Sequence, residues 1–296
     1  MSKKSLLTVL LLVGLPLSFV YADSTKEEEP IEKKWTVKGI TGVNLSQTSL
    51  VNWSAGGENT IATNVYLNVA ANYVKGKLSW DNDFSTEYGT TYTSSNKWVK
   101  SVDKLAIATK LGYKMSGKWY LSGLADFRTQ YDKGYKDNKK EQYISKLLAP
   151  AYTNIAIGAD YKPNKNLSVF MSPVTGKMTI VRDDYLSSIG AFGVKEGKKF
   201  RGEFGAYVKG DLSYEIMKNV TLLSKASLFT AYDKSFGNVD IIWENIISMK
   251  VNKLLTATIN TNLQYDNDVK ILDENGQGGA KVQFKELIGV GIAYKF

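Results

Sequence analysis

The final stretch of the sequence, Gln283 to Phe296, alternates between two kinds of side chain. One face carries large apolar residues, namely Phe284, Ile288, Val290, Ile292, Tyr294 and Phe296. The other face carries small or polar residues, and Glu286 is the one break in the apolar face. A period of two is the signature of an extended strand. Chain ends usually fray, so a strand that continues to an aromatic last residue constrains the fold strongly.

This ending resembles the closing strand of bacterial outer-membrane β-barrels, which commonly end in Phe as part of their assembly signal. Eleven further segments alternate in the same way: 35–46, 61–73, 78–88, 104–113, 119–131, 155–161, 167–171, 203–216, 220–232, 239–251 and 255–265. The sequence therefore predicts an all-β chain, a single closed antiparallel transmembrane β-barrel of about 12 strands with short periplasmic turns and long extracellular loops.

Connection lengths support this prediction. Tight turns such as Lys75-Gly76 and Ser116-Gly117 follow the even-numbered strands, and longer connections follow the odd-numbered ones. We expect the longest connection between Pro173 and Phe200, because Ser172-Pro173 is placed at the end of the seventh strand. The first and the last strand then both have their chain termini on the short-turn side, which is the layout of bacterial outer-membrane barrels.

The first 34 residues differ from the rest of the sequence. Lys3 and Lys4 precede an apolar run from residue 6 to residue 20, and Ala22 follows. This pattern predicts a cleaved signal peptide over residues 1–22. Residues 23–34 are charged and nearly free of apolar side chains, so we expect a flexible periplasmic segment. The barrel is assigned to residues 35–296, in the outer membrane of a Gram-negative bacterium.

Aromatic residues near the strand ends indicate lipid outside the barrel rather than a packed soluble core. Trp35, Tyr73 and Trp80 belong to the short-turn end, whereas Phe204 and Tyr232 belong to the loop end. Two aromatic belts separated by aliphatic residues match the two membrane interfaces. The alternative is a secreted β-sandwich or lipocalin-like barrel, which would alternate but would not need such belts. We expect outer-membrane lipid and, during biogenesis, the barrel-assembly machinery as partners.

Composition excludes several classes of chemistry. The chain has no cysteine and no histidine, which rules out disulfides, Cys/His zinc sites and catalysis by an imidazole base or a thiol. A Ser–Lys or dicarboxylate membrane hydrolase is a disfavoured alternative, so we expect no enzyme, no catalytic residue, no cofactor and no metal. The formal charge is +9. Lysines are interspersed with acidic residues in an exported chain, so we expect a solvated surface and no nucleic-acid partner.

Four short motifs resemble a known family. They are the block from Asn52 to Asn59 (NWSAGGEN), Arg128-Thr129-Gln130, Ser172-Pro173 and Gly289-Val290-Gly291. Together they resemble an uncharacterised outer-membrane β-barrel family of Bacteroidota, catalogued as a domain of unknown function, over residues 35–296. The resemblance implies a compartment and a fold. It transfers no functional residues.

The first external loop contains one candidate site, formed by Asn52, Trp53, Gly56, Gly57 and Glu58. The two glycines permit a sharp bend, and Trp53 supplies one large apolar side chain. We favour a loop that packs in the barrel mouth over a loop that contacts a ligand.

The lumen face carries charges of both signs. We select as candidate pore-lining residues Asp81, Asp83, Lys104, Asp126, Arg128 and Gln130. The charges indicate either a cross-lumen ion-pair network or a constriction that selects solutes. Twelve strands lie between small filled barrels and open porins in diameter. We therefore expect a narrow porin-like channel for small hydrophilic solutes, with a non-conducting structural or interaction barrel, whose loops bind a partner, as the alternative.

Overall fold

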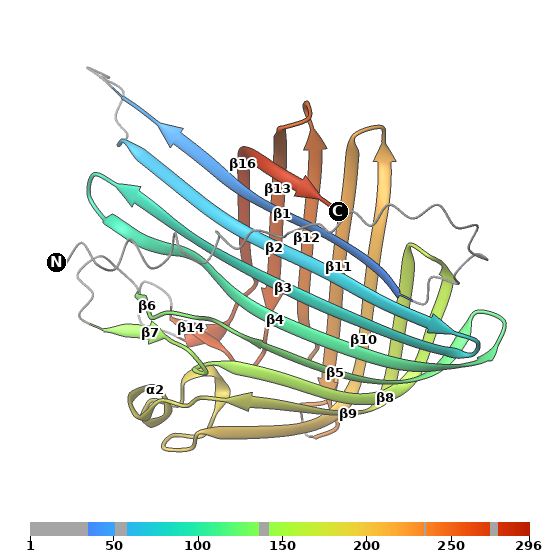
Figure 1. Ribbon diagram of the computed structural model, residues 1–296. Helices are drawn as coiled ribbons and strands as arrows, with labels where there is room; N and C mark the ends of the chain where they lie inside the picture. Colours follow the sequence, from blue (N-terminus) through green and yellow to red (C-terminus); the bar gives the residue numbers. More distant parts are fainter. Residues whose placement is uncertain (1–34, 51–57, 136–141, 234, 273–277) are drawn as a thin grey trace. The chain divides into compact units, whose positions relative to one another are not determined.

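Twelve antiparallel strands close into one barrel, which confirms the predicted fold class. The computed structural model describes residues 35–50, 58–135, 142–233, 235–272 and 278–296. Strands β1 to β4 cross the view diagonally in front of the more upright β11 to β13 (Figure 1), as tilted barrel strands do. Within the described ranges, the structure contains no helix with the length and apolar character needed to cross a membrane.

The barrel strands are β1 (Trp35–Thr48), β2 (Thr60–Lys75), β3 (Leu78–Thr93), β4 (Lys97–Ser116), β5 (Trp119–Thr129), β8 (Ala151–Asn164), β9 (Leu167–Ile180), β10 (Phe200–Met217), β11 (Val220–Ala231), β12 (Asp240–Lys250), β13 (Leu255–Tyr265) and β16 (Gln283–Lys295). Two small hairpins lie in the connections, β6 (Gly134–Tyr135) with β7 (Tyr143–Ser145), and β14 (Lys270–Leu272) with β15 (Gly278–Ala280). The connection from β9 to β10 contains α2 (Asp184–Ser188) and the 3₁₀ turn η1 (Ala191–Gly193).

The last residue of the chain completes the barrel. Strand β16 pairs with β1 over Ile40 to Leu45, and Phe296 exchanges two backbone hydrogen bonds with Gly39, of 2.8 and 3.0 Å. A Cβ atom on Gly39 would lie 2.2 Å from Cζ of the Phe296 ring. The ring therefore occupies space that only a glycine leaves free, which gives the terminal aromatic residue a structural role in closure.

Two sequence predictions about connections are wrong. Strand β9 does not end at Ser172-Pro173 but continues to Ile180, with a register shift against both neighbours near Pro173. A bulge accommodates proline, which has no N–H to donate to the ladder. The connection after β3 is also a tight turn, because β3 and β4 stay paired as far as Thr93 and Lys97. Threonines continue this hairpin, since β-branched side chains favour strands even when polar.

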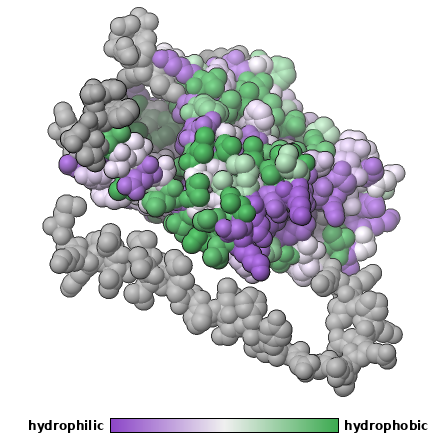
Figure 2. All heavy atoms as spheres, turned by 90° about the horizontal axis from the view of Figure 1, so that it is seen from above, coloured by the Kyte–Doolittle hydropathy of each residue, from purple (hydrophilic) through white to green (hydrophobic). Residues whose placement is uncertain are grey.

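The outer face of the barrel is apolar. Large side chains that point away from the lumen stay exposed, among them Val43, Leu111, Leu121, Ile155, Ile157, Ile288 and Ile292. Figure 2 shows a broad apolar area on the face in view, with hydrophilic side chains gathered beside it. Aromatic contacts occur at both ends, for example Trp35–Tyr73 at 5.1 Å and Phe204–Tyr232 at 5.7 Å between ring centroids. An apolar exterior around a closed sheet is the arrangement of a transmembrane barrel.

Candidate functional site: the barrel lumen

Ion pairs bridge opposite walls of the lumen. In the ring of twelve strands, β4 and β12 are six places apart, and so are β3 and β11. Lys104 Nζ on β4 nevertheless lies 2.5 Å from Glu244 Oε2 on β12, and Lys225 Nζ on β11 lies 2.9 Å from Asp83 Oδ1 on β3. Both pairs cross the full width of the barrel, so they narrow the lumen and tie its walls together.

An apolar layer fills part of the lumen, in addition to the charges. Its members are buried and come from five neighbouring strands: Leu124, Ala156, Phe170, Tyr207, Phe229 and Ala231. Sequence reasoning assigned a polar inner face and missed this layer. The available signal was Phe170, which is apolar but shares its strand face with Ser168 and Ser172. These buried side chains fill the part of the lumen next to their five strands.

A second polar network occupies the short-turn end of the lumen. Lys110 Nζ lies 2.8 Å from Asp160 Oδ2 and donates a 2.6 Å hydrogen bond to Ser168. Lys162 Nζ lies 2.6 Å from Asp81 Oδ2. Asp160 is fully buried, so its charge requires these cationic partners. The network links strands β3, β4, β8 and β9 across the base of the barrel.

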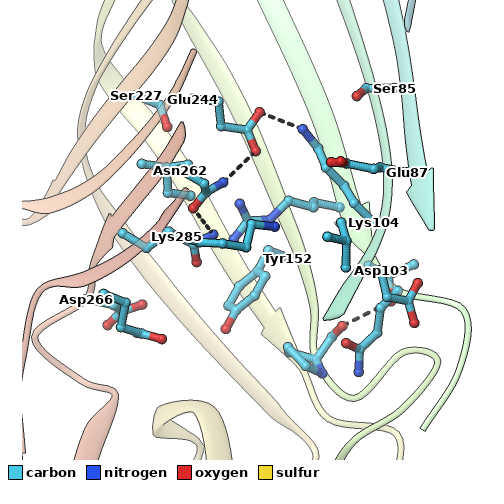
Figure 3. Close-up of a pocket in the computed structure, with 18 of the residues that line it drawn as sticks. Ser85, Glu87, Asp103, Lys104, Tyr152, Ser227, Glu244, Asn262, Asp266 and Lys285 are labelled. Carbon is cyan, nitrogen blue, oxygen red and sulfur yellow. Dashed lines mark hydrogen bonds and ion pairs between the residues drawn. The ribbon is translucent and has the colours of Figure 1, made fainter. Parts of the chain in front are cut away.

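A cavity of about 420 Å³ lies on the loop side of the apolar layer. Tyr207 and Phe229 of that layer line it, whereas Lys110, Asp160 and Lys162 of the short-turn network do not. Much of the remaining lining is polar, including Asn68, Ser85, Glu87, Arg128, Asn154 and Asn262. Figure 3 shows Glu244 in this cavity between Lys104 and Asn262. A volume of this order suits a small-molecule site.

The structure places the six candidate pore-lining residues at different depths. Lys104, Arg128 and Gln130 line the cavity. Asp83 belongs to a cross-lumen pair and Asp81 to the short-turn network. The carboxylate of Asp126 accepts hydrogen bonds from Asn154, with a shortest distance of 3.0 Å, and from Tyr207 at 3.4 Å. Three of the six therefore meet at one site, and the other three organise the lumen around it.

The predicted loop motif is only partly described. Asn52, Trp53, Gly56 and Gly57 lie outside the described residues. The Glu58 carboxylate accepts hydrogen bonds from the backbone N–H of Ser95 at 2.9 Å and from its hydroxyl at 3.0 Å. The Ser95 N–H, followed by its hydroxyl, lowers the pKa of Glu58. Glu58 thus joins the first external connection to the β3–β4 turn.

Two external connections pack against each other at the loop end. Ala149, Val181, Leu186 and Val194 form a buried cluster with Phe192 packed against it. Residues from both connections line the cavity, Ile144 from one and Phe192 from the other. The second connection contributes η1 and α2 to this arrangement. Residues 142–150 and 181–199 therefore form a structured cap, which borders the cavity on the side away from the apolar layer.

Asp183 joins the same two connections through polar contacts. Its side chain caps α2 by accepting a 2.8 Å hydrogen bond from the Leu186 N–H. It also accepts a 3.0 Å bond from the Tyr143 hydroxyl and pairs with Lys146. Burial opposes ionisation, but the Leu186 N–H, Lys146 and Tyr143 outweigh it and lower the pKa of Asp183.

One group of three carboxylates in the described part of the chain has a spacing that suits a metal ion, namely Asp240, Asp266 and Asp268. Cationic side chains already hold these groups. Lys177 Nζ lies 2.5 Å from Asp240 and 3.5 Å from Asp266, and Arg201 lies 2.5 Å from Asp268. The cluster is therefore an ion-pair network in this structure.

Comparison with solved structures found barrels of similar architecture. The COG4313 outer membrane channel from Pseudomonas putida F1 has 11% identity, a TM-score of 0.41, and coverage of 93% of this chain and 100% of that one. The NanC porin has 10% identity, a TM-score of 0.40, and coverage of 86% and 98%. The translocator domain of the autotransporter NalP from Neisseria meningitidis has 8% identity, a TM-score of 0.34, and coverage of 98% and 95%. At these scores none of the three assigns a function to this chain.

Comparison with curated proteins found no match. Residues 45–135 match the model of a family described as "Protein of unknown function (DUF3078)". This segment runs from β1 through β5 to the β6 strand, and it includes the Asn52–Asn59 block and the Arg128-Thr129-Gln130 motif. The match confirms, for residues 45–135, the resemblance to a family of unknown function.

Proposed function

We propose that this chain is an outer-membrane protein whose barrel forms a narrow, normally constricted channel for small hydrophilic solutes. One observation carries the proposal: the polar cavity of about 420 Å³ inside the lumen. Its hydroxyl, amide and charged side chains replace part of a solute's hydration shell. The apolar exterior supports a membrane location, and residues 1–22 provide the export signal.

Passage to the short-turn side requires side-chain movement. The layer around Phe170 and the cross-lumen pair Lys225–Asp83 stand in the way. Side-chain rotation occurs without disturbing backbone pairing, so the barrel wall stays closed while the constriction opens. We therefore expect low conductance and a sharp upper limit on solute size.

Solute uptake by proteoliposomes tests this function. Vesicles containing the folded barrel are expected to swell in arabinose and to exclude the trisaccharide raffinose, because the constriction admits only small solutes. Vesicles without protein, and vesicles with unfolded chain, provide the controls. Equal exclusion of arabinose and raffinose by a correctly folded barrel would argue against a channel.

A non-conducting barrel is the second candidate, and the buried apolar layer is the observation that favours it. Phe170 has no solvent-exposed surface, which is unusual for a residue facing a water-filled channel. In this case the structured cap of residues 142–150 and 181–199 is the surface available to a partner. Failure of the barrel to admit any solute would favour this candidate.

A further inference from the structure

Arg128 is a cation of the lumen cavity that has no direct carboxylate partner among the described residues. With the residues that the structure describes, its guanidinium forms no hydrogen bond and no ion pair within 4 Å. Lys104 and Lys177, by contrast, each have a carboxylate partner at 2.5 Å. Lys285 also lines the cavity and, like Arg128, forms no ion pair among the described residues. Arg128 lies on β5 opposite Tyr152 of β8, and its guanidinium carbon is 5.4 Å from the centre of the Tyr152 ring.

The carboxylates of Glu244 and Asp126 already accept hydrogen bonds from other side chains. Glu244 gives one oxygen to Lys104 at 2.5 Å and the other to Asn262 at 3.0 Å. Asp126 accepts hydrogen bonds from Asn154 and Tyr207 on its two oxygens. Both carboxylates act on Arg128 electrostatically, but other side chains hold their oxygens. A direct oxyanion partner for the guanidinium therefore has to come from a ligand.

Glu87 is the cavity carboxylate that lacks an ion pair among the described residues. It accepts a hydrogen bond from Asn64, and Lys285 and Lys104 act on it electrostatically from other strands. Glu87 makes no direct ion pair with Arg128 among the described residues, so it does not replace the missing partner. The stacked ring of Tyr152 holds the guanidinium plane without neutralising it.

Three buried polar atoms of cavity residues lack a hydrogen-bond partner. The Tyr66 hydroxyl and the side-chain oxygens of Asn154 and Asn260 are buried and have no hydrogen-bond partner within the described structure. All three residues line the cavity. Unpaired buried polar groups are costly, so a small side-chain movement that brings these atoms to a bound solute would remove that cost.

We propose that Arg128, stacked on Tyr152, anchors a small hydroxylated solute through its oxyanion group, a carboxylate or a phosphate. The planar guanidinium presents two parallel N–H groups that match either oxyanion in a bidentate pair. The cavity volume accommodates a solute of about the size of a sugar acid. This inference rests on the proposed function, because it identifies the class of solute that occupies the channel.

Equilibrium dialysis of the refolded full chain in detergent tests the proposal independently of conduction. Radiolabelled gluconate is the probe, and sorbitol is its neutral counterpart. We expect gluconate to bind and excess sorbitol not to displace it. Arg128→Gln should weaken gluconate binding about 10- to 100-fold, as expected for the loss of a charged hydrogen-bonded pair. Arg182→Gln removes the same charge from an exposed loop position and should leave binding unchanged.

Two further arms sharpen the result. Arg128→Lys keeps the charge but loses the bidentate geometry, so it should bind gluconate more weakly than the native chain and more tightly than Arg128→Gln. Displacement by inorganic phosphate would support a general oxyanion site, and failure of phosphate to displace gluconate would support a carboxylate site. Circular dichroism confirms that each variant is folded.

The proposal is overturned if the native barrel does not bind gluconate, if it binds sorbitol equally well, or if Arg128→Gln binds gluconate as tightly as the native chain. Should Arg128→Gln fail to fold, equal binding by Arg128→Lys and the native chain would overturn it. A barrel that transports arabinose but does not bind gluconate refutes this inference alone. A barrel that binds gluconate but admits no solute refutes only the channel.

Discussion

Lys104 Nζ and Glu244 Oε2 lie 2.5 Å apart, although their strands stand on opposite sides of the twelve-strand ring. Each side chain is about one fifth exposed, so neither charge is fully solvated. The pair connects two opposite walls of the barrel, and both residues line the cavity. It therefore contributes both to the stability of the barrel and to the width of the lumen.

Lys104→Met should destabilise the barrel by about 1–3 kcal/mol, because Glu244 then keeps a partly buried charge with Asn262 as its remaining hydrogen-bond partner. The double variant Lys104→Met/Glu244→Gln should recover part of this loss, because no unpaired charge remains. Urea unfolding in lipid vesicles, followed by tryptophan fluorescence, measures the effect. Strictly additive single-variant effects would show that the two side chains do not interact.

A lysine on the outer face should be costly in a membrane. Ile157, midway along β8, points outward and is 61% exposed. Near the bilayer midplane, Ile157→Lys should lower the free energy of unfolding by about 2–4 kcal/mol. Ile189→Lys is the matched control, because Ile189 is similarly exposed but lies in the β9–β10 connection. Equal effects of the two substitutions in vesicles would contradict a lipid-facing Ile157.

The register at the closing seam is open to a covalent test. Val43 and Ile292 face each other across β1 and β16, and both are exposed on the outer face. Opposite residues of antiparallel strands are close enough for a disulfide, and the native chain has no cysteine. Val43→Cys/Ile292→Cys should cross-link on oxidation and change gel mobility. The diagonal pair Val43→Cys/Val290→Cys should cross-link far less. More cross-linking of the diagonal pair than of the opposite pair would show a different register.

The contacts of Asp183 predict a pH-dependent cap. Its pKa is lowered in the folded state, so its contribution to loop stability is complete above the unfolded value of about 3.9 and is lost as the pH falls through the folded pKa. Carboxyl-carbon NMR should show Asp183 titrating below the ordinary range.

Lys146→Gln should raise the Asp183 midpoint, because the ammonium partner is lost. Asp184→Asn is the control, since that carboxylate pairs with Lys199 instead, and it should leave the Asp183 midpoint unchanged. An Asp183 resonance that titrates at the ordinary value in the native chain would contradict the described contacts.

The sequence was sufficient to predict the barrel because strand alternation is local. The face of the sheet to which Val290 or Ile292 belongs follows from the adjacent residues in the sequence. Closure was also predictable, because the pattern continues to Phe296. The lengths of β3 and β9 were not, since threonine-rich strand ends and a proline bulge look like loops when hydrophobicity alone is considered.

The site was predictable in part only. Alternation assigned Lys104, Arg128 and Gln130 to the lumen, and all three line the cavity. Alternation does not specify which residues meet across a barrel, so the pairing of Lys104 with Glu244 could not be derived. The lack of a direct partner for Arg128 depends on such pairings, because other side chains hold the oxygens of Glu244 and Asp126.

Single-channel recording in a planar bilayer tests the central claim most directly. We predict small, steady conductance steps for the native barrel, because the constriction around Phe170 is narrow. Phe170→Ala should increase the conductance, since it removes the largest fully buried lumen side chain, whereas Ile157→Ala on the outer face should leave it unchanged. Absence of current from all three correctly folded barrels would contradict a channel.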